Sequence, residues 1–359
     1  MKIKELSFKA PARVVLFGEH QDYLGLPVIP AAVDLYMVIK GKLNNLNQYQ
    51  VDLPDLKTSQ RFSASQIAFQ SGREYLQSGV KVLQEEGIIP KNKGVSARIT
   101  SQIPMQAGLS SSSALNVIWI AFLAKIFGTS LAPMEITKLA HRSEVLEFNE
   151  PGGMQDHMAI AHGFVNFEEF DPIKCTRLKV DLPGIVVGNS LERKDTLNTL
   201  STIRNGVERG LKFMGVSRVK KLTLEDIQII DHHDNELDQF SLNVLKGAVT
   251  NFELTKLGYN ELKKPISSID EEYIGRLMSK HHASLRDYLD VSTPKIEKMI
   301  DAAMHAGAFG CKVTGSGNGG CMIAYCPGHE DEVSKAIEGV GAQTHIAKIV
   351  SGVSQIKSA

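Results

Sequence analysis

The sequence predicts a protein of the α+β class with two domains. Its 359 residues are enough for two domains of ordinary size, each with a substantial core. Patterns typical of strands are interleaved with helical patterns, without the strict strand–helix alternation of a parallel sheet. Asp171-Pro172 and Pro183-Gly184 mark a break near residue 180. We therefore expect one domain over residues 1–180 and a second over residues 181–359.

Four strands and two helices are expected in the first 190 residues. The strands are short apolar runs or apolar alternations, at residues 14–17, 95–99, 164–167 and 185–187. Apolar side chains recur at helical spacing from Leu115 to Ile126, which predicts the strongest helix of the chain. A second helix is expected from Pro133, a residue suited to a first helical turn, to about Phe148.

The remaining residues predict more helix than strand. Helices are expected over residues 236–258 and 270–287, from Pro294 onward and near 329–339. Short strands are expected at 311–314 and 321–325, on either side of a glycine-rich loop, and a final strand follows the last helix. The uneven order of helices and strands supports the α+β assignment.

Composition excludes several classes of protein. Lys plus Arg and Asp plus Glu both number 40, so no global field favours nucleic acid or a membrane surface. The N-terminus lacks the apolar core of a signal peptide, and the longest apolar stretch, 117–124, is too short to span a bilayer. The four cysteines lack CxxC spacing, which is typical of reduced core thiols rather than disulfides or zinc ligands. We expect a cytoplasmic protein without nucleic-acid or membrane partners; its oligomeric state stays open.

The loop over residues 104–114 is the most informative segment. It follows a predicted strand, contains Gly108, Leu109 and the four serines Ser110, Ser111, Ser112 and Ser113, and opens the strongest helix. Small residues let backbone amides approach a ligand, and a helix N-terminus attracts anions. The alternative is a capped helix without a ligand, but four serines exceed what a cap requires. The loop therefore favours phosphate binding, although it is not a Walker A motif.

A second glycine cluster lies at residues 315–320. It contains Gly315, Gly317, Gly319 and Gly320 and formally satisfies G-x-G-x-x-G. A dinucleotide site needs a helix directly after the loop, whereas residues 321–325 are predicted to form a strand. A tight turn between two strands is the simpler interpretation, but four glycines in six residues exceed its needs. We expect the backbone here to approach either a ligand or the first loop closely.

Two further groups of polar residues could carry chemistry. Arg13, Glu19, His20 and Asp22 gather around the end of the first strand, and such alternating donors and acceptors suit a polyol. A solvated turn with a surface ion pair is the alternative. Asp156 follows Gly152-Gly153 and could be a general base, a metal ligand or a helix cap.

Taken together, these stretches resemble the GHMP kinases, and among them the galactokinases. Residues 10–23 (APARVVLFGEHQDY) are similar to the galactokinase signature, and residues 108–114 (GLSSSSA) to the phosphate loop of the family. Residues 312–321 (KVTGSGNGGC) resemble its third motif, and residues 284–294 (SLRDYLDVSTP) are also similar to galactokinases. The matches run in the order of the family, which makes them more specific than any single motif.

The resemblance implies a fold and a set of roles. The fold would combine an N-terminal domain like domain 2 of ribosomal protein S5 with a ferredoxin-like C-terminal domain, and ATP would bind in the cleft between them. Asp156 would be the catalytic base and Arg13 would counter developing negative charge. The sugar would contact Arg13, Glu19, His20, Asp22, Gly153 and Asp156. ATP would contact residues 108–113, Gly315 and Gly317, and Mg²⁺ would be bound by Ser112 and Glu144.

Departures from the galactokinase pattern keep other substrates open. Gln106 replaces a usual glycine, and the Gln155-Asp156 pair is more similar to fucokinases, glucuronokinases and heptose-phosphate kinases. Ser201 stands where galactokinases present a tyrosine to the sugar. We expect an ATP-dependent, galactokinase-like enzyme that phosphorylates the anomeric hydroxyl of a sugar. The alternatives are a uronic acid, a fucose-like sugar or a heptose phosphate as substrate, or a non-catalytic sensor of sugar and ATP; a mevalonate-type kinase is less favoured.

Overall fold

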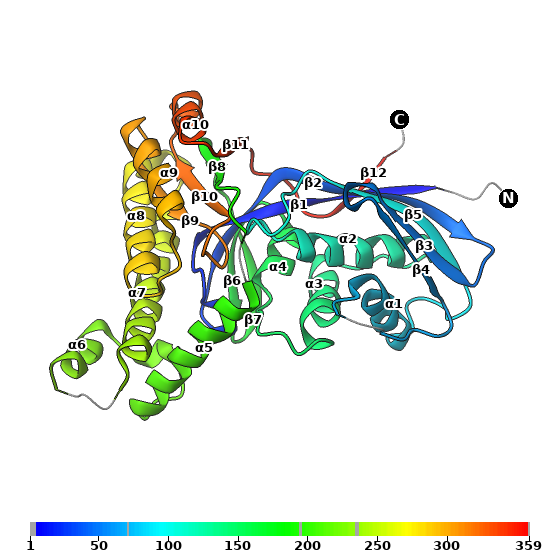
Figure 1. The fold of residues 1–359 in the computed structure, drawn as a ribbon, viewed down its shortest axis with the longest axis horizontal. Coiled ribbons are helices and arrows are strands. Elements are labelled where there is room, and N and C mark those ends of the chain that lie inside the picture. Colours follow the sequence, from blue (N-terminus) through cyan, green and yellow to red (C-terminus); the bar gives the residue numbers. More distant parts are fainter. Residues whose placement is uncertain (1–4, 70–71, 194–195, 234–236, 358–359) are drawn as a thin grey trace.

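The chain forms two β-sheets, one in each half, with helices packed against them (Figure 1). This computed structural model describes residues 5–69, 72–193, 196–233 and 237–357. Within those ranges, the first sheet has the order β12-β1-β2-β5-β3-β4, with β6 paired to β2 and β7 to β6. Its strands from the first half are β1 (Leu6–Phe17), β2 (Ile29–Asn44), β3 (Gln48–Leu53), β4 (Thr58–Ser63), β5 (Gly94–Ser101), β6 (Val165–Phe170) and β7 (Ile173–Leu178).

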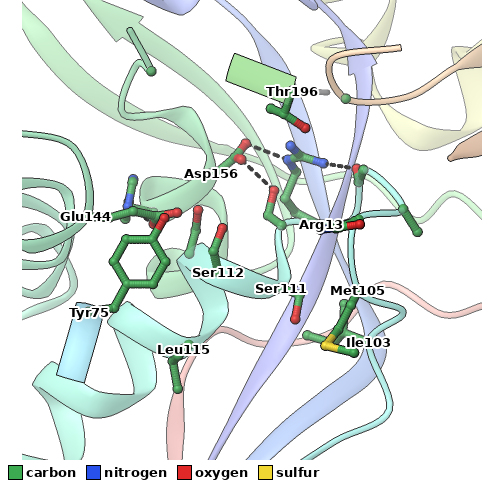
Figure 2. A pocket seen from close by; sticks show the side chains of 18 of the residues that line it. Arg13, Tyr75, Ile103, Met105, Ser111, Ser112, Leu115, Glu144, Asp156 and Thr196 are labelled. Atoms are coloured by element: carbon green, nitrogen blue, oxygen red, sulfur yellow. Dashed lines mark hydrogen bonds and ion pairs between the residues drawn. The ribbon is translucent and has the colours of Figure 1, made fainter. Parts of the chain in front are cut away.

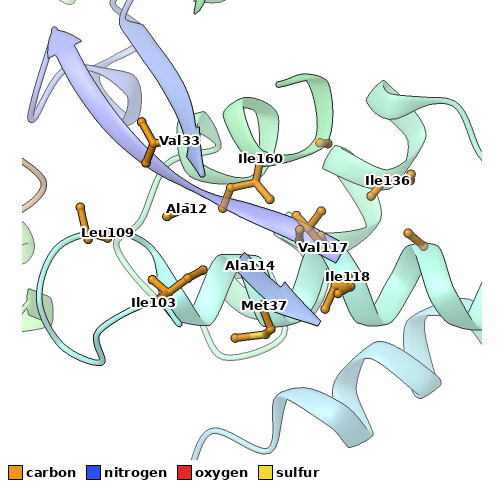
Figure 3. Close-up of a cluster of buried hydrophobic side chains, with 14 of the residues drawn as sticks. Ala12, Val33, Met37, Ile103, Leu109, Ala114, Val117, Ile118, Ile136 and Ile160 are labelled. Carbon is orange, nitrogen blue, oxygen red and sulfur yellow. The ribbon is translucent and has the colours of Figure 1, made fainter. Parts of the chain in front are cut away.

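Helices of the first half cover this sheet. They are α1 (Tyr75–Glu85), α2 (Ser111–Ile126), α3 (Pro133–His141) and α4 (Gln155–His162). Helix α2 is apolar on nearly every side, and Val117 and Ile118 lie in a core cluster with Ile160 of α4 and Met37 of β2 (Figure 3). A helix that is apolar all round is buried. The core thereby fixes α2, and with it the loop that opens the helix.

The helix expected over residues 133–148 ends earlier than predicted. α3 stops at His141, and the π-helical turn η3 (Arg142–Leu146) follows it. π-helical turns are rare and often occur at functional sites. The turn is held in place by Ser143, whose hydroxyl donates to Asn116 Oδ1 (2.8 Å) and whose carbonyl accepts from the hydroxyl of Ser78 (2.7 Å).

The second half is built around a four-stranded antiparallel sheet. Its order is β11-β8-β10-β9, with β8 (Ile185–Asn189), β9 (Gly310–Val313), β10 (Cys321–Tyr325) and β11 (Gln343–Ala347). Its helices are α5 (Thr196–Phe213), α6 (Leu224–His233), α7 (Gln239–Leu262), α8 (Glu271–Asp287), α9 (Pro294–His305) and α10 (Glu330–Gly339). The α+β class is therefore confirmed. Across the described ranges, no helix combines the length and the apolar character that a membrane span needs.

The end of the chain returns to the first sheet. Strand β12 (Ser354–Ile356) pairs antiparallel with β1, and Ile349 and Ser351 form single bridges to Val33 and Gly163. The chain crosses from the first sheet to the second between β7 and β8, near residue 180. The tail, which the predicted unit over residues 181–359 includes, therefore completes an edge of the first sheet.

Candidate active site

A cavity of about 640 Å³ is lined by residues from both halves of the chain. The first half contributes the end of β1, the loop before α2, η3 and the start of α4. The second half contributes Thr196, Leu197 and Leu200 of α5, and Gly315 and Ser316 of the glycine loop. Arg13, Asp156, Ser112 and Glu144, predicted from separate motifs, are all brought to this one cavity (Figure 2).

The loop before α2 presents polar groups to the cavity. Gly108 and Ser110 have left-handed backbone angles (φ 86° and 58°), and so does Gln106 (φ 54°), which stands where the resembling kinases have glycine. Leu109 is buried in the core and anchors the loop. The hydroxyls of Ser111 and Ser112 have no hydrogen-bond partner among the described residues. Together with the positive end of α2, these hydroxyls form a surface whose chemistry suits an anion.

Asp156 lies in the first turn of α4 and is held by two side chains. Its Oδ1 is 2.6 Å from Nε of Arg13, and its Oδ2 accepts from the hydroxyl of Ser110 (2.5 Å). Arg13 also donates from Nη1 to the carbonyl of Gly108 (2.6 Å), as Figure 2 shows. Burial alone would raise the pKa of Asp156, but Arg13 and Ser110 outweigh it and hold the pKa below its usual value. Asp156 is therefore ionised at neutral pH.

Asp22 accepts from the backbone at the start of the same helix. Its Oδ2 accepts from the backbone N–H of Gln155 (3.3 Å), an otherwise uncapped N-terminal donor of α4. Gly153 leaves room for this contact, because a Cβ atom there would lie 1.9 Å from Asp22 Oδ2. Burial, and next the charge of Asp156, raise the pKa of Asp22 to about 6. Asp22 and Asp156 are thus two neighbouring carboxylates with opposite pKa shifts.

His20 lines the cavity and joins the two halves. Its Nε2 is 3.1 Å from the carbonyl oxygen of Ser316, and its Nδ1 is 2.9 Å from the hydroxyl of Tyr23. The backbone of His20 is left-handed (φ 61°). These contacts fix the turn after β1 against the second glycine loop and place His20 at the wall of the cavity.

Glu19 lies elsewhere, which corrects the expectation that it faces the sugar. It is buried outside the described cavity lining and forms an ion pair with Lys312 of β9. The Lys312 ammonium also donates to the carbonyls of Val15 (3.0 Å) and Val313 (2.9 Å). Burial raises the pKa of Glu19 and lowers that of Lys312, although their attraction opposes both shifts. A buried carboxylate needs such a partner, and Lys312 pairs with Oε1 of Glu19 between the two sheets, whereas Oε2 has no hydrogen-bond partner among the described residues.

Glu144 and Ser112 supply oxygen ligands that fit Mg²⁺. Both line the cavity; the Glu144 side chain extends from η3, and Ser112 lies in the first turn of α2 (Figure 2). No cluster of three or more His, Cys, Asp or Glu side chains that could hold a metal occurs within the described ranges. Mg²⁺ on a nucleotide requires only one or two protein carboxylates, because phosphates and water complete its shell. The donor set therefore suits a nucleotide-bound magnesium ion rather than a metal cage.

The second glycine loop packs on the first. A Cβ atom at Gly315 would lie 2.7 Å from the carbonyl oxygen of Gly108, and one at Gly320 would lie 2.6 Å from that of Ala107. Of the two expected neighbours, a ligand or the first loop, the backbone approaches the first loop. Gly315 also lines the cavity, whereas Gly317 is outside its described lining and packs against Val291.

Sequence reasoning missed several residues of the site. His157, next to Asp156, contacts Glu144 (2.7 Å between Nε2 and Oε2), and its position after the candidate base was the available signal. Glu168 of β6 is fully buried; burial, and next Asp22 and Asp156, raise its pKa well above the usual value. No motif marked it.

On α5, Leu197 and Leu200 line the cavity, whereas the Ser201 hydroxyl donates to the carbonyl of Asn198.

The chain matches known proteins along most of its length. The GHMP kinases N terminal domain matches residues 74–164, the GHMP kinases C terminal domain residues 262–343, and the galactokinase galactose-binding signature residues 2–42. The mevalonate kinase of Thermococcus sibiricus is 31% identical over 352 residues, 95% of either chain. The galactokinase of Thermococcus kodakarensis is 26% identical over 88% of this chain and 87% of its own.

A solved structure agrees with these matches. Lactococcus lactis galactokinase, crystallised with galactose, superposes with a TM-score of 0.85 at 22% identity, over 98% of this chain and 95% of that one. The two-domain fold implied by the resemblance is thereby confirmed. On these matches, together with the phosphate loop and the cavity between the two halves, the chain belongs to the GHMP kinase family.

Proposed function

We propose that this kinase transfers the γ-phosphate of ATP to the anomeric hydroxyl of a neutral, galactose-configured sugar. The observation that carries the proposal is the position of Asp156. Its carboxylate is bonded to Arg13 and to Ser110 of the phosphate loop, at the cavity wall. A hydroxyl bound at Asp156 would therefore lie next to phosphates bound at α2.

The chemistry follows from the charges of this network. Because its pKa is lowered, Asp156 is ionised before the sugar binds and can accept a hydrogen bond from the attacking hydroxyl. As the new oxygen–phosphorus bond forms, the bond between the γ-phosphorus and the oxygen that bridges to the β-phosphate breaks and ADP leaves; Asp156 takes the hydroxyl proton and Arg13 offsets the charge near the transferring group. Phosphoryl transfer depends mainly on such positioning and electrostatics, so no covalent enzyme intermediate is needed.

The phosphate loop would hold the nucleotide. Backbone amides of residues 108–113 would face the phosphates, and Ser112 and Glu144 would bind the accompanying Mg²⁺. When bound, Mg²⁺ supplies charge neutralisation for the triphosphate. Gly315 lines the cavity beside this loop and would border the phosphates, whereas Gly317 would support the loop through its packing on Val291.

The charges at the sugar end favour a neutral substrate. Asp22 and Asp156 line this end, and Glu168 lies buried beside them. Arg13 is already paired with Asp156, and Arg73, the other arginine of the described lining, is paired with Glu150 (2.6 Å). A carboxylate or phosphate on the substrate would be repelled by these carboxylates, the same effect that adds to burial in raising the pKa of Asp22. Mevalonate, uronic acids and heptose phosphates are therefore disfavoured, whereas hydroxyls can donate to these carboxylates.

Phosphorylation of mevalonate is the second candidate. It is favoured by the 31% identity to the Thermococcus sibiricus mevalonate kinase over nearly the whole chain. A mevalonate carboxylate would need a cation near Asp22, and the arginines of the described lining already have partners. We therefore rank a neutral sugar above mevalonate.

The test is a substrate panel with Mg²⁺ and ATP. It includes galactose, glucose, fucose, arabinose, mannose, galacturonate, glucuronate, heptose phosphate and mevalonate, and NMR locates the phosphate on each product. We expect turnover of galactose, or of another neutral sugar with its configuration, with the phosphate on C1. Preference for an anionic substrate would overturn the charge argument, and phosphate on a non-anomeric oxygen would overturn the mechanism. Absence of ATP turnover with every compound would favour the sensor alternative.

A further inference from the structure

We propose that His157 is a positioning residue for the magnesium-binding carboxylate of Glu144. It holds Oε2 of Glu144 and thereby presents Oε1 to the metal ion that accompanies ATP. The inference rests on the proposed function, because it takes Glu144 as a ligand of that ion. His157 itself contacts neither the substrate nor the nucleotide in this assignment.

The contact between the two side chains is short and shielded from solvent. Nε2 of His157 lies 2.7 Å from Oε2 of Glu144, and the side chains are only 2% and 8% exposed. An ionised carboxylate can only accept a hydrogen bond, so Nε2 of His157 is the donor. The other ring nitrogen, Nδ1, has no hydrogen-bond partner within the described ranges. The ring therefore uses one nitrogen, and that nitrogen fixes one carboxylate oxygen.

The orientation of the Glu144 side chain depends on its contact with His157. The turn η3 is anchored to two helices: the Ser143 hydroxyl donates to Asn116 of α2, and the Ser78 hydroxyl of α1 donates to the Ser143 carbonyl. The His157 ring is held in turn by His141, which meets it edge to face at 5.4 Å between ring centres. Among the described residues, His157 is the one that donates a hydrogen bond to the Glu144 carboxylate. The backbone thus sets the position of Glu144, and His157 sets the direction of its carboxylate.

This contact also connects the helix that carries the candidate base with the turn that carries the candidate metal ligand. His157 directly follows Asp156 on α4, whereas Glu144 lies on η3. Residues that orient metal ligands commonly contribute about 10- to 100-fold to metal affinity. The connection would fix the distance between the sugar hydroxyl and the metal-bound phosphate.

The test measures metal-dependent nucleotide binding, which needs no turnover. Calorimetry gives the Kd of a non-hydrolysable ATP analogue with Mg²⁺ and with EDTA, and the ratio of the two is the gain due to the metal. The amide of His157→Gln can donate from a position near Nε2, whereas the shorter amide of His157→Asn reaches only toward Nδ1. We expect the gain to stay within about threefold of wild type for His157→Gln and to fall about 10-fold or more for His157→Asn. The affinity of both variants for the ATP analogue in EDTA should stay within about twofold of the wild-type value.

Two further variants separate the possible failures. His162→Gln changes a half-buried histidine at the other end of α4 and should leave the gain unchanged. Glu144→Ala should abolish the gain; if it does not, the metal role of Glu144 in the proposed function fails. If Glu144→Ala abolishes the gain but His157→Asn retains it, only the positioning role of His157 is overturned. Equal losses in His157→Gln and His157→Asn would also overturn it, because the donor would then not matter.

Discussion

The two ends of the cavity differ in how their side chains are held. At the sugar end, Asp156 is bonded to Arg13 and Ser110, and Asp22 accepts from the backbone of Gln155. At the phosphate end, the hydroxyls of Ser111 and Ser112 lack partners among the described residues, and the side chain of Met105 is 60% exposed. The end that we propose to bind the sugar (the sugar end) is therefore organised by the protein itself, whereas the end that we propose to bind Mg²⁺ and ATP (the phosphate end) keeps hydroxyls without partners among the described residues.

This difference determines what a substitution should change. Removing one member of a buried hydrogen-bonded pair leaves the other without a partner, which costs about 1–3 kcal/mol. Variants at the sugar end should therefore alter both catalysis and the stability of the ligand-free protein. Variants at the phosphate end should alter nucleotide binding and leave ligand-free stability nearly unchanged.

Replacing the candidate base should give the largest effect. Asp156→Asn removes the proton acceptor while keeping the side-chain size, so kcat should fall about 100-fold or more. Arg13 loses its charged partner, so thermal unfolding of the ligand-free protein should also shift downward. Nucleotide affinity, measured by calorimetry, should change by less than about twofold. Asp171→Asn, which changes an exposed carboxylate paired with Lys220, is the control and should leave kcat unchanged. Turnover of Asp156→Asn within a few-fold of wild type would contradict the assignment.

A methyl group at Gly153 should disturb the sugar end without removing a charge. The Cβ atom of Gly153→Ala would lie 1.9 Å from Asp22 Oδ2, so Asp22 or the start of α4 must shift. A displacement of about 1 Å near the reacting groups can cost on the order of 100-fold, so kcat/KM for the sugar should fall about 10- to 100-fold. The matched control is Gly152→Ala, whose Cβ atom would meet its nearest neighbour, Val145, at an ordinary 3.5 Å. Equal kcat/KM values for the two variants would show that the fit of Asp22 against Gly153 is unimportant.

The sequence predicted elements with a strong local pattern and missed those that depend on distant partners. Helix α2 was predicted because its apolar spacing is regular, and β10 because its apolar run follows a glycine-rich loop. The π-helical turn η3 was not predicted, because its anchors, Ser78 and Asn116, come from other helices. Helix α4 was missed as well, since its eight residues are too short for a clear period.

The same limit applies to the site. Arg13, Asp22 and Asp156 each lie in or next to a recognisable motif, and the fold brings them to one cavity. Glu19 lies in such a motif too, but its partner Lys312 is 293 residues away, and only the packing of the two sheets reveals the ion pair. A motif thus identifies a polar residue, whereas the three-dimensional partners decide whether that residue faces a ligand or stabilises the fold.

The pKa shift of Asp22 predicts a pH dependence confined to the sugar end. Burial and Asp156 raise its folded-state pKa to about 6, so the protonated form stabilises the fold at low pH, and this contribution is lost as the pH rises through about 6. In the proposed function the ionised form of Asp22 accepts from the sugar, so wild-type kcat/KM for the sugar should fall as the pH is lowered through about 6. Asp22→Asn should lower kcat/KM about 10-fold or more at pH 8.

At the same pH, Asp22→Asn should increase the free energy of unfolding, because the neutral amide avoids burying a second negative charge near Asp156. Denaturant unfolding at pH 5 and pH 8 measures this, and the gain should be smaller at pH 5, where Asp22 is already largely protonated. A variant that is destabilised at pH 8 would show that the hydrogen bond to Gln155 outweighs the charge repulsion.

Two serines of one loop allow the finest comparison, with the smallest expected effects. Ser110 bonds to Asp156, whereas the Ser112 hydroxyl faces the phosphate end. Ser110→Ala should lower kcat and destabilise the ligand-free protein by about 1 kcal/mol, since Asp156 loses a donor. Ser112→Ala should leave ligand-free unfolding unchanged and raise the KM for Mg·ATP a few-fold, because one oxygen ligand of the metal is lost. Parallel unfolding and kinetic measurements on the two variants test this. If Ser112→Ala destabilised the ligand-free protein as much as Ser110→Ala, the phosphate end would also be held by internal bonds, and the contrast between the two ends would be lost.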